Sequence, residues 1–143
     1  MRTVVCLLSL GALVSLACGD DGGPVCDCTV AGCYAAACTK TVFVTSETTP
    51  ATFGGVAQAD KICQDAAAAA GLQGTFYAWL SDATTSPFMR FGESTVPYRL
   101  VDGVQIADDW QSLVDLGPAA PIDVDARGQK VADPAMSEVV WTN

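Results

Sequence analysis

The sequence contains no histidine and few basic residues. Its 143 residues include 7 Lys and Arg against 16 Asp and Glu, which gives a formal net charge of −9. Without histidine the chain lacks the most common general base and the most common transition-metal ligand, which excludes Ser-His-Asp and Cys-His catalysis within it. The Lys and Arg residues are scattered singly and form no cluster that could neutralise phosphates, so we expect no nucleic-acid partner.

The first 17 residues have the pattern of a secretory signal peptide. Arg2 precedes an apolar run from Val4 to Ala17. This run is too short to span a bilayer comfortably, so a cleaved signal is favoured over a transmembrane helix. The remaining length suits one compact domain with a tail.

The segment that ends this signal, Ser15-Leu16-Ala17-Cys18, resembles a bacterial lipoprotein processing site. At such a site the cysteine is acylated and becomes the first residue. The polar Gly-Asp-Asp-Gly-Gly that follows suits a flexible tether, so we expect lipidation of Cys18. The alternative is an ordinary signal peptide cleaved near Ala17, which leaves Cys18 as a plain thiol. The predicted location is the outer-membrane surface of the bacterial cell envelope, with the N-terminal lipid as the sole membrane contact.

Residues 18–39 are predicted to form a lipid-anchored, cysteine-rich stalk. Four cysteines follow the pattern C-x-C-x4-C-x4-C: Cys26, Cys28, Cys33 and Cys38. In an exported protein they most simply form two disulfides, in one of three connectivities. A tetrathiolate metal site is the alternative, although the paired cysteines of structural zinc sites usually have two to four residues between them.

Residues 40–143 have the pattern of an α+β domain. Alternating β-branched and aromatic residues predict strands over 40–45 and 72–80, the second of them central because both of its faces are apolar. Alanine-rich residues 56–71 predict a helix that ends at Gly71. The apolar face of this helix is expected to hold Ala59, Ile62, Cys63, Ala66 and Ala70.

Turn and capping signals predict a hairpin over 98–106, a short helix over 108–115, a hairpin over 122–131 and a strand over 138–142. The first hairpin has Asp102-Gly103 between apolar runs, which is a strong turn signal. The short helix has an acidic first turn. The side chains expected to face inward from it are Trp110, Leu113 and Val114.

Four stretches between residues 54 and 142 carry a family resemblance. They are Ala59-Asp60 with Cys63; Ala70-Gly71-Leu72 with Gly74-Thr75-Phe76 and Ala78-Trp79-Leu80; Val96-Pro97 through Trp110-Gln111-Ser112-Leu113; and Val140-Trp141. In this order they resemble the endostatin-like branch of the C-type-lectin-like fold, and a bacterial lipoprotein domain of unknown function that shares the pattern. The resemblance implies two helices packed on small antiparallel sheets, with long loops that present a binding surface.

The ligand sites of this family do not carry over to the sequence. Endostatin-like domains hold zinc with histidines and bind heparin through exposed arginines, whereas this domain has only Arg90, Arg99 and Arg127 in an acidic sequence. The calcium loops of sugar-binding lectins need asparagine, and the only asparagine here is the last residue. Asp123 and Asp125 could bind calcium as paired carboxylates, but a solvated hairpin is the default interpretation. We therefore predict no metal, cofactor-binding or catalytic residue.

The resemblance also implies a partner for Cys63 beyond the strand at Val140-Trp141. The given chain ends at Asn143, so we expect Cys63 to be unpaired within it and the C-terminal part of the domain to be missing. Cys6 is expected to leave with the signal peptide. A buried free thiol in the core is the alternative explanation for Cys63.

Together these observations predict a non-enzymatic lipoprotein whose domain binds a protein or glycan partner. One alternative is a structural spacer of the envelope. Another is a carboxylate-based hydrolase that uses a pair such as Asp82 and Glu93. The side chains that motivate the binding function are aromatic, although core packing is the more common role of such residues. They are Tyr77, Trp79, Phe88, Phe91 and Tyr98.

Overall fold

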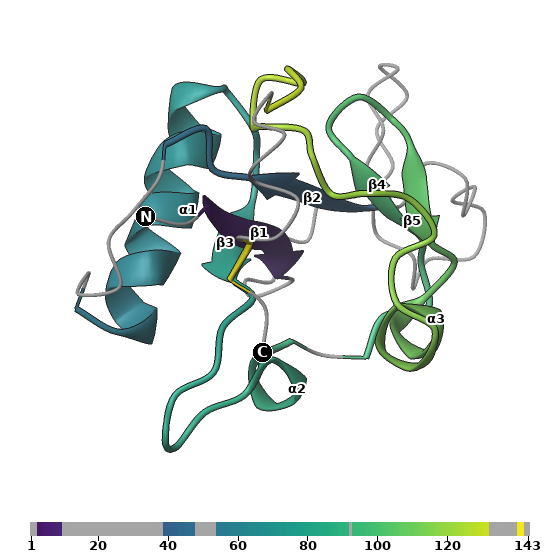
Figure 1. The fold of residues 1–143 in the computed structure, drawn as a ribbon, viewed down its shortest axis with the longest axis horizontal. Coiled ribbons are helices and arrows are strands. Elements are labelled where there is room, and N and C mark those ends of the chain that lie inside the picture. The colour runs from purple at the N-terminus through teal and green to yellow at the C-terminus, as the bar shows by residue number, and fades with distance from the viewer. Residues whose placement is uncertain (1–2, 10–38, 48–53, 92, 132–139, 142–143) are drawn as a thin grey trace, which may run out of the picture.

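The computed structural model describes residues 3–9, 39–47, 54–91, 93–131 and 140–141. These residues form an α+β domain, which confirms the predicted class (Figure 1). The predicted lipidation site and the four stalk cysteines (Cys18, Cys26, Cys28, Cys33 and Cys38) lie outside the described residues. The elements in chain order are β1 (Thr3–Ser9), β2 (Lys40–Val44), α1 (Val56–Ala69), β3 (Thr75–Ala78), α2 (Pro87–Arg90), β4 (Tyr98–Leu100), β5 (Gln105–Ala107), α3 (Trp110–Asp115) and β6 (Val140–Trp141).

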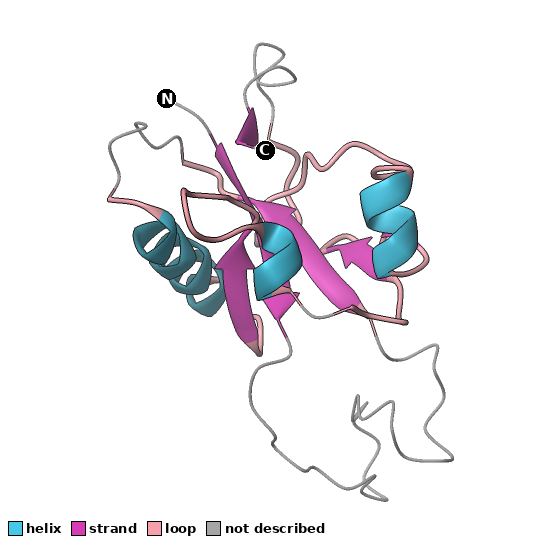
Figure 2. Ribbon diagram, turned by 90° about the horizontal axis from the view of Figure 1, so that it is seen from below, coloured by secondary structure: helices cyan, strands magenta, loops and turns pink. Residues whose placement is uncertain are grey.

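Five strands form a mixed sheet in the order β3-β1-β2-β4-β5, and β6 pairs with the start of β1. β1 runs antiparallel to β2 and β3, with Cys6 opposite Phe43 of β2 and Ala78 of β3, and parallel to β6. β2 and β4 are parallel, and β4 and β5 form the hairpin that Asp102-Gly103 predicts. Helix α1 lies against β3 and β1, whereas α3 lies beyond β5 at the other end of the sheet (Figure 1, Figure 2).

Strand β1 lies in the interior of the sheet, between β3 and β2, and its sequence predicts a signal peptide. Four consecutive residues of it, from Val4 to Leu7, are at most 2 % exposed. Val4 and Cys6 face one apolar cluster under α1, and Val5 and Leu7 face a second cluster that includes Trp110. An uninterrupted apolar run is typical both of a strand buried on two faces and of the core of a signal peptide. The signal peptide therefore remains a prediction, while the strand is the observed conformation.

The strand predicted over 72–80 is shorter and lies elsewhere than expected. As β3 it covers residues 75–78 and forms the end of the sheet beside β1, so the prediction of a central position is wrong. Each of its two apolar faces packs against a segment outside the sheet. Phe76 packs with the α1 residues, and Tyr77 on the opposite face packs against Phe91 in the segment after α2. Tertiary packing thus gives an end strand the composition of a central one.

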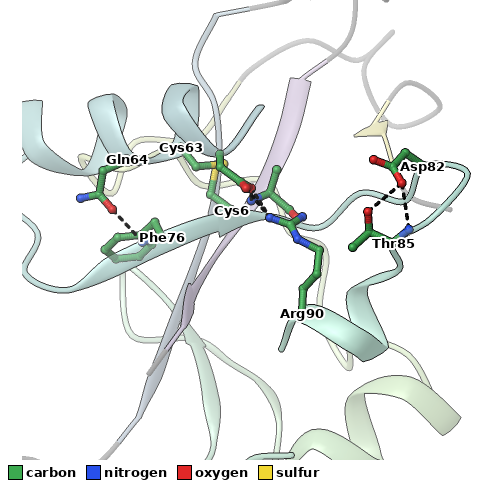
Figure 3. A network of polar contacts seen from close by, with 9 residues as sticks. Cys6, Cys63, Gln64, Phe76, Asp82, Thr85 and Arg90 are labelled. Carbon is green, nitrogen blue, oxygen red and sulfur yellow. Dashed lines mark hydrogen bonds and ion pairs between the residues drawn. A yellow bond between two sulfur atoms is a disulfide. The ribbon is translucent and has the colours of Figure 1, made fainter. Parts of the chain in front are cut away.

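Cys63 is disulfide-bonded to Cys6 in the structure. This differs from the expectation that Cys63 is unpaired within the given chain. The physical reason is the place of β1, because the strand runs beneath α1 and directs the Cys6 side chain toward the buried face of the helix (Figure 3). The expectation had removed Cys6 together with the signal peptide and so left Cys63 without a partner.

Local signals predict most of the other elements, but not helix α2, which lies in a segment expected to be polar and turn-rich. Helix α1 ends where Gly71, with a φ of +75°, turns the chain, and the Leu72 amide donates to the Ala67 carbonyl. On its predicted apolar face Ala59 and Cys63 are buried, whereas Ile62, Ala66 and Ala70 are half-buried and Ala67 is buried instead. Helix α3 and β6 lie within their predicted ranges, and in α3 the expected inward position of Val114 is wrong because its side chain is 41 % exposed. None of the described helices has the length and apolar character needed to cross a membrane.

Candidate functional site

A cluster of aromatic side chains joins the end of β3, helix α2 and helix α3. The Trp79 ring stacks on Phe91 with centroids 5.5 Å apart and packs against Trp110 at 5.4 Å. Phe88 of α2 lies 6.4 Å from the Trp110 ring. Trp110 and Phe91 are buried, yet Phe88 is 68 % exposed and the adjacent Met89 is 71 % exposed. Core aromatics therefore support two large apolar side chains that lie in solvent.

Arg90 fixes helix α2 to the rest of the domain. Its Nη1 donates to the Ala78 carbonyl oxygen at 2.8 Å, and its Nη2 pairs with both carboxylate oxygens of Asp60 on α1 (Figure 3). Asp60 Oδ1 also accepts from the Ala78 amide at 2.9 Å. The guanidinium lies 5.4 Å from the centre of the Tyr77 ring. The exposed pair on α2 consequently has a rigid base formed by α1 and β3.

An apolar cavity of about 410 Å³ lies beside this cluster. Its walls come from the sheet, from α3 and from the chain that follows α3, and Trp79 belongs to both the cavity and the aromatic cluster. None of the described lining residues is charged. Those residues are Val5, Leu7, Val42, Trp79, Ile106, Leu113, Val114, Pro118 and Ile122.

Acidic residues surround helix α3 at one side of the cavity. Asp109 caps the helix, because its Oδ1 accepts from the Ser112 amide at 2.7 Å. Hydrogen bonds from the Ser112 hydroxyl and amide lower the pKa of Asp109, so this carboxylate stays charged at neutral pH. Asp108 and Asp115 accept bonds from neighbouring glutamine amides rather than from cations. The flank of the cavity is therefore negatively charged. Leu116, which follows α3, is 86 % exposed.

Asp123 and Asp125, the paired carboxylates considered as calcium ligands, have other partners. Asp123 pairs with Lys130 Nζ at 2.7 Å, and Asp125 Oδ1 accepts from the amides of Arg127 and Gln129. These bonds close a turn, and Val124 bridges Lys130 across it, which agrees with the default interpretation of a solvated hairpin. In the described ranges no three Asp, Glu or Cys side chains are grouped so that they could hold a metal ion.

The carboxylates considered for hydrolysis are not brought into the cavity. Asp82 lies in the loop after β3, where its Oδ1 accepts from the amide and hydroxyl of Thr85 (Figure 3). It also accepts from the amide and hydroxyl of Thr84. These bonds lower the pKa of Asp82 well below its ordinary value, and the bond from the Thr85 hydroxyl has the largest effect. This direction is opposite to the raised pKa that the proton donor of a glycosidase needs. Glu93 is an exposed residue of the same connection.

A second hollow, of about 330 Å³, lies between α1, the end of β2 and the turn at 125–127. Its carboxylates include Asp65, which pairs with Lys61, and Asp125, which closes its own turn. These groups are occupied by intramolecular partners, so the apolar cavity is the better candidate for ligand binding.

The structure brings together four of the five aromatic residues that motivated a binding function. Trp79, Phe91 and Phe88 meet around Trp110, and Tyr77 packs against Phe91. Tyr98 is buried in β4, and burial raises its pKa to about 12, so it belongs to the core. Sequence reasoning missed the cavity, because its walls come from segments far apart in the chain. It also missed the exposure of Leu116. The pair Phe88-Met89 after Pro87 was the one local signal of an exposed helical turn.

Comparison of the chain with protein-family models, with curated proteins and with solved structures finds no match.

Proposed function

We propose that this chain is a non-enzymatic binding protein of the bacterial cell envelope. In this proposal Cys18 carries the lipid anchor, the stalk cysteines form disulfides, and a C-type-lectin-like domain binds a partner protein. The resemblance of residues 54–142 and the α+β arrangement of the described elements support the domain assignment. The exposed apolar side chains beside the uncharged cavity carry the binding function. Two residues of the described cavity wall, Val5 and Leu7, belong to the segment that processing removes.

The chemistry of the cavity favours an apolar protein segment over a glycan. Its described walls are aliphatic side chains, a proline and Trp79, which offer few hydrogen bonds to sugar hydroxyls. Exposed Phe88, Met89 and Leu116 extend the apolar surface beyond the cavity. The aspartates around α3 add negative charge, so a partner with apolar side chains next to Lys or Arg complements this surface.

A peptide titration tests this function. The probe is a short peptide with a Leu-Phe-Leu centre and two lysines at each end. The readout is the tryptophan fluorescence of the chain, to which Trp79 and Trp110 contribute together with Trp141. We expect a saturable change for the full chain that Val114→Lys weakens at least tenfold, because Val114 lies on the cavity wall. Val104→Lys is the matched control, since Val104 is 43 % exposed, close to the 41 % of Val114, and lies in the β4–β5 hairpin.

Equal affinity in the two variants would show that the peptide does not use the cavity. Binding of neutral oligosaccharides in preference to the peptide would assign a glycan partner. Absence of binding to both classes of probe would favour the structural spacer.

A further inference from the structure

Strand β1 is the link between two parts of the sheet. Among the described strands β3 pairs with β1 alone, while β2 continues to β4 and β5 on the other side. Figure 1 shows β1 between β2 and β3. Removal of residues 1–17, which the lipid anchor requires, takes this strand out of the sheet. The edges of β2 and β3 then lose their backbone partners, and the inner faces of both apolar clusters are uncovered.

The position that β1 occupies has a defined chemistry. Its backbone is bonded along both sides, including Trp79 N–H to the Val5 carbonyl at 2.8 Å and Thr45 N–H to the Val4 carbonyl at 3.0 Å. Four consecutive side chains are at most 2 % exposed, so no charge can be accommodated there at low cost. Cys63 of α1 meets the third of these residues, Cys6, through the disulfide. The position thus selects an extended, uncharged segment with a cysteine at one register.

We propose that the space between β2 and β3, with Cys63 at its side, is a strand-acceptor site. In the processed protein it binds an extended apolar segment of a second protein, which pairs antiparallel with β2 and β3 and forms a disulfide with Cys63. The donor cysteine arrives as a disulfide with a small thiol. The Cys63 thiolate attacks the donor sulfur, the new S–S bond forms, and the small thiol leaves with the electron pair of the old bond, so no further oxidant is needed.

A second protein fits this site better than the stalk does. Cys26 and Cys28 flank Asp27, whose carboxylate takes the buried place of Val5 or Leu7 when one of these cysteines replaces Cys6. Cys38 comes two residues before β2 and cannot return along it as an antiparallel partner. The remaining stalk cysteine is Cys33. If it replaced Cys6, Gly32 would replace Val5, and a glycine has no side chain to fill the apolar contacts of that valine. The proposal rests on the processing step of the proposed function. It also bears on the cavity, because the donor strand takes the places of Val5 and Leu7, which form part of the cavity wall in the unprocessed chain.

A strand-replacement experiment on the full chain tests the site. A protease recognition sequence replaces residues 19–23, and the chain is cut there after purification, so that the N-terminal piece remains attached through Cys6–Cys63. Reduced glutathione then releases this piece. The probe is the peptide Thr-Val-Val-Cys-Leu-Leu-Ser, with its cysteine as a glutathione disulfide. The control peptide has lysine in place of the second valine, at the position that matches Val5.

We expect release to abolish the cooperative thermal transition, and the probe to restore it with a covalent mass increase at Cys63. The lysine peptide should react at least tenfold less. A transition that persists after release would overturn the proposal, because the site would not need a strand. Failure of the probe to restore the transition would overturn it as well. The same cut chain with Cys63→Ser shows whether any mass increase belongs to the stalk cysteines.

Disulfide mapping of the protein isolated from envelopes tests the donor. A chain that begins at Cys18, with Cys63 bonded to a cysteine of another protein, supports the proposal. Retention of residues 3–9 with Cys6–Cys63 intact overturns both the acceptor site and the lipid anchor. A bond from Cys63 to Cys33 or to any other cysteine of the same chain, or a free Cys63 thiol, overturns the second-protein donor alone. Peptide binding at the cavity, compared between Val114→Lys and Val104→Lys, is scored separately in every case.

Discussion

At the scale of single residues, Asp60 has more tertiary bonds than any other described carboxylate. It accepts from the Ala78 amide and pairs with Arg90, and its side chain is 23 % exposed against 11 % for that of Arg90. Asp65, one turn later on the same helix, pairs with Lys61 in a fully solvated position, where both side chains are more than 60 % exposed. The two aspartates therefore offer a matched comparison of tertiary and surface pairing.

We predict that Asp60→Ala lowers the free energy of unfolding by about 3 kcal/mol, because it leaves the Arg90 guanidinium half-buried without its counter-charge and frees the Ala78 amide. Asp65→Ala should change it by less than about 0.5 kcal/mol, since exposed i,i+4 pairs contribute little. Urea denaturation followed by tryptophan fluorescence measures both. Similar values for the two variants would contradict the role assigned to Asp60.

The two loop and capping carboxylates predict an acid-sensitive domain. Hydrogen bonds lower the folded-state pKa values of Asp82 and Asp109 below the ordinary value of 3.8. A depressed folded-state pKa contributes stability above the unfolded value, and this contribution is lost as the pH falls through the folded value. We expect the urea midpoint to be level from neutral pH to about pH 4.5 and to decrease below about pH 4. The double variant Asp82→Asn/Asp109→Asn should show a shallower decrease, and an unchanged profile would contradict the assignment.

At the scale of elements, the sequence predicts those that depend on neighbouring residues and does not predict those that depend on long-range packing. The Asp102-Gly103 hairpin and the Asp109-capped helix α3 follow from neighbouring residues, and both are confirmed. The position of β3 does not follow from its own residues, because the cover of its two faces comes from α1 and from the segment around Phe91. The site shows the same division, since the exposed pair on α2 is contiguous in sequence while the cavity walls span residues 5 to 122.

Gly74, just before β3, tests the contact between this element and β1. Its φ is +109°, and a Cβ added there would lie 2.3 Å from Leu8 Cδ1. Gly103 has a φ of +92° and no atom within 4 Å of its added Cβ. We predict that Gly74→Ala lowers the free energy of unfolding more than Gly103→Ala, by about 1 kcal/mol, because backbone strain is common to both and the clash belongs to one. In urea denaturation, the extra destabilisation by Gly74→Ala should disappear when Leu8 is also replaced by alanine. If it persists, Leu8 is not the side chain that the added methyl group meets.

At the scale of the whole molecule, the disulfide joins the first strand to the first helix over a sequence separation of 57 residues. No local pattern predicts this pair, because Cys6 lies in an apolar run that also fits a signal peptide and its partner is chosen by the sheet. Family resemblance directed attention to Cys63 but implied a different partner. The predicted α+β class is correct despite the wrong disulfide partner, because the class depends on the spacing of the elements and not on which strand is central.

We predict that Cys63→Ala lowers the free energy of unfolding of the unprocessed chain by about 4 kcal/mol, from the loss of a cross-link across a loop of this length. Cys6→Ala and the double variant should have the same effect, because each removes the same bond. Urea denaturation without reductant measures all three. A wild-type midpoint in any of them would show that the bond does not form in that chain.

During synthesis, β1 leaves the ribosome well before one of its two antiparallel partners. Its antiparallel partner β3 follows about 70 residues later in the chain, which at roughly 5–20 residues per second leaves β1 unpaired at one edge for several seconds during translation. In the lipoprotein proposed above, the apolar N-terminal segment would meet the export machinery during this interval, before folding buries it. Under that proposal, folding and export compete for the same seven residues.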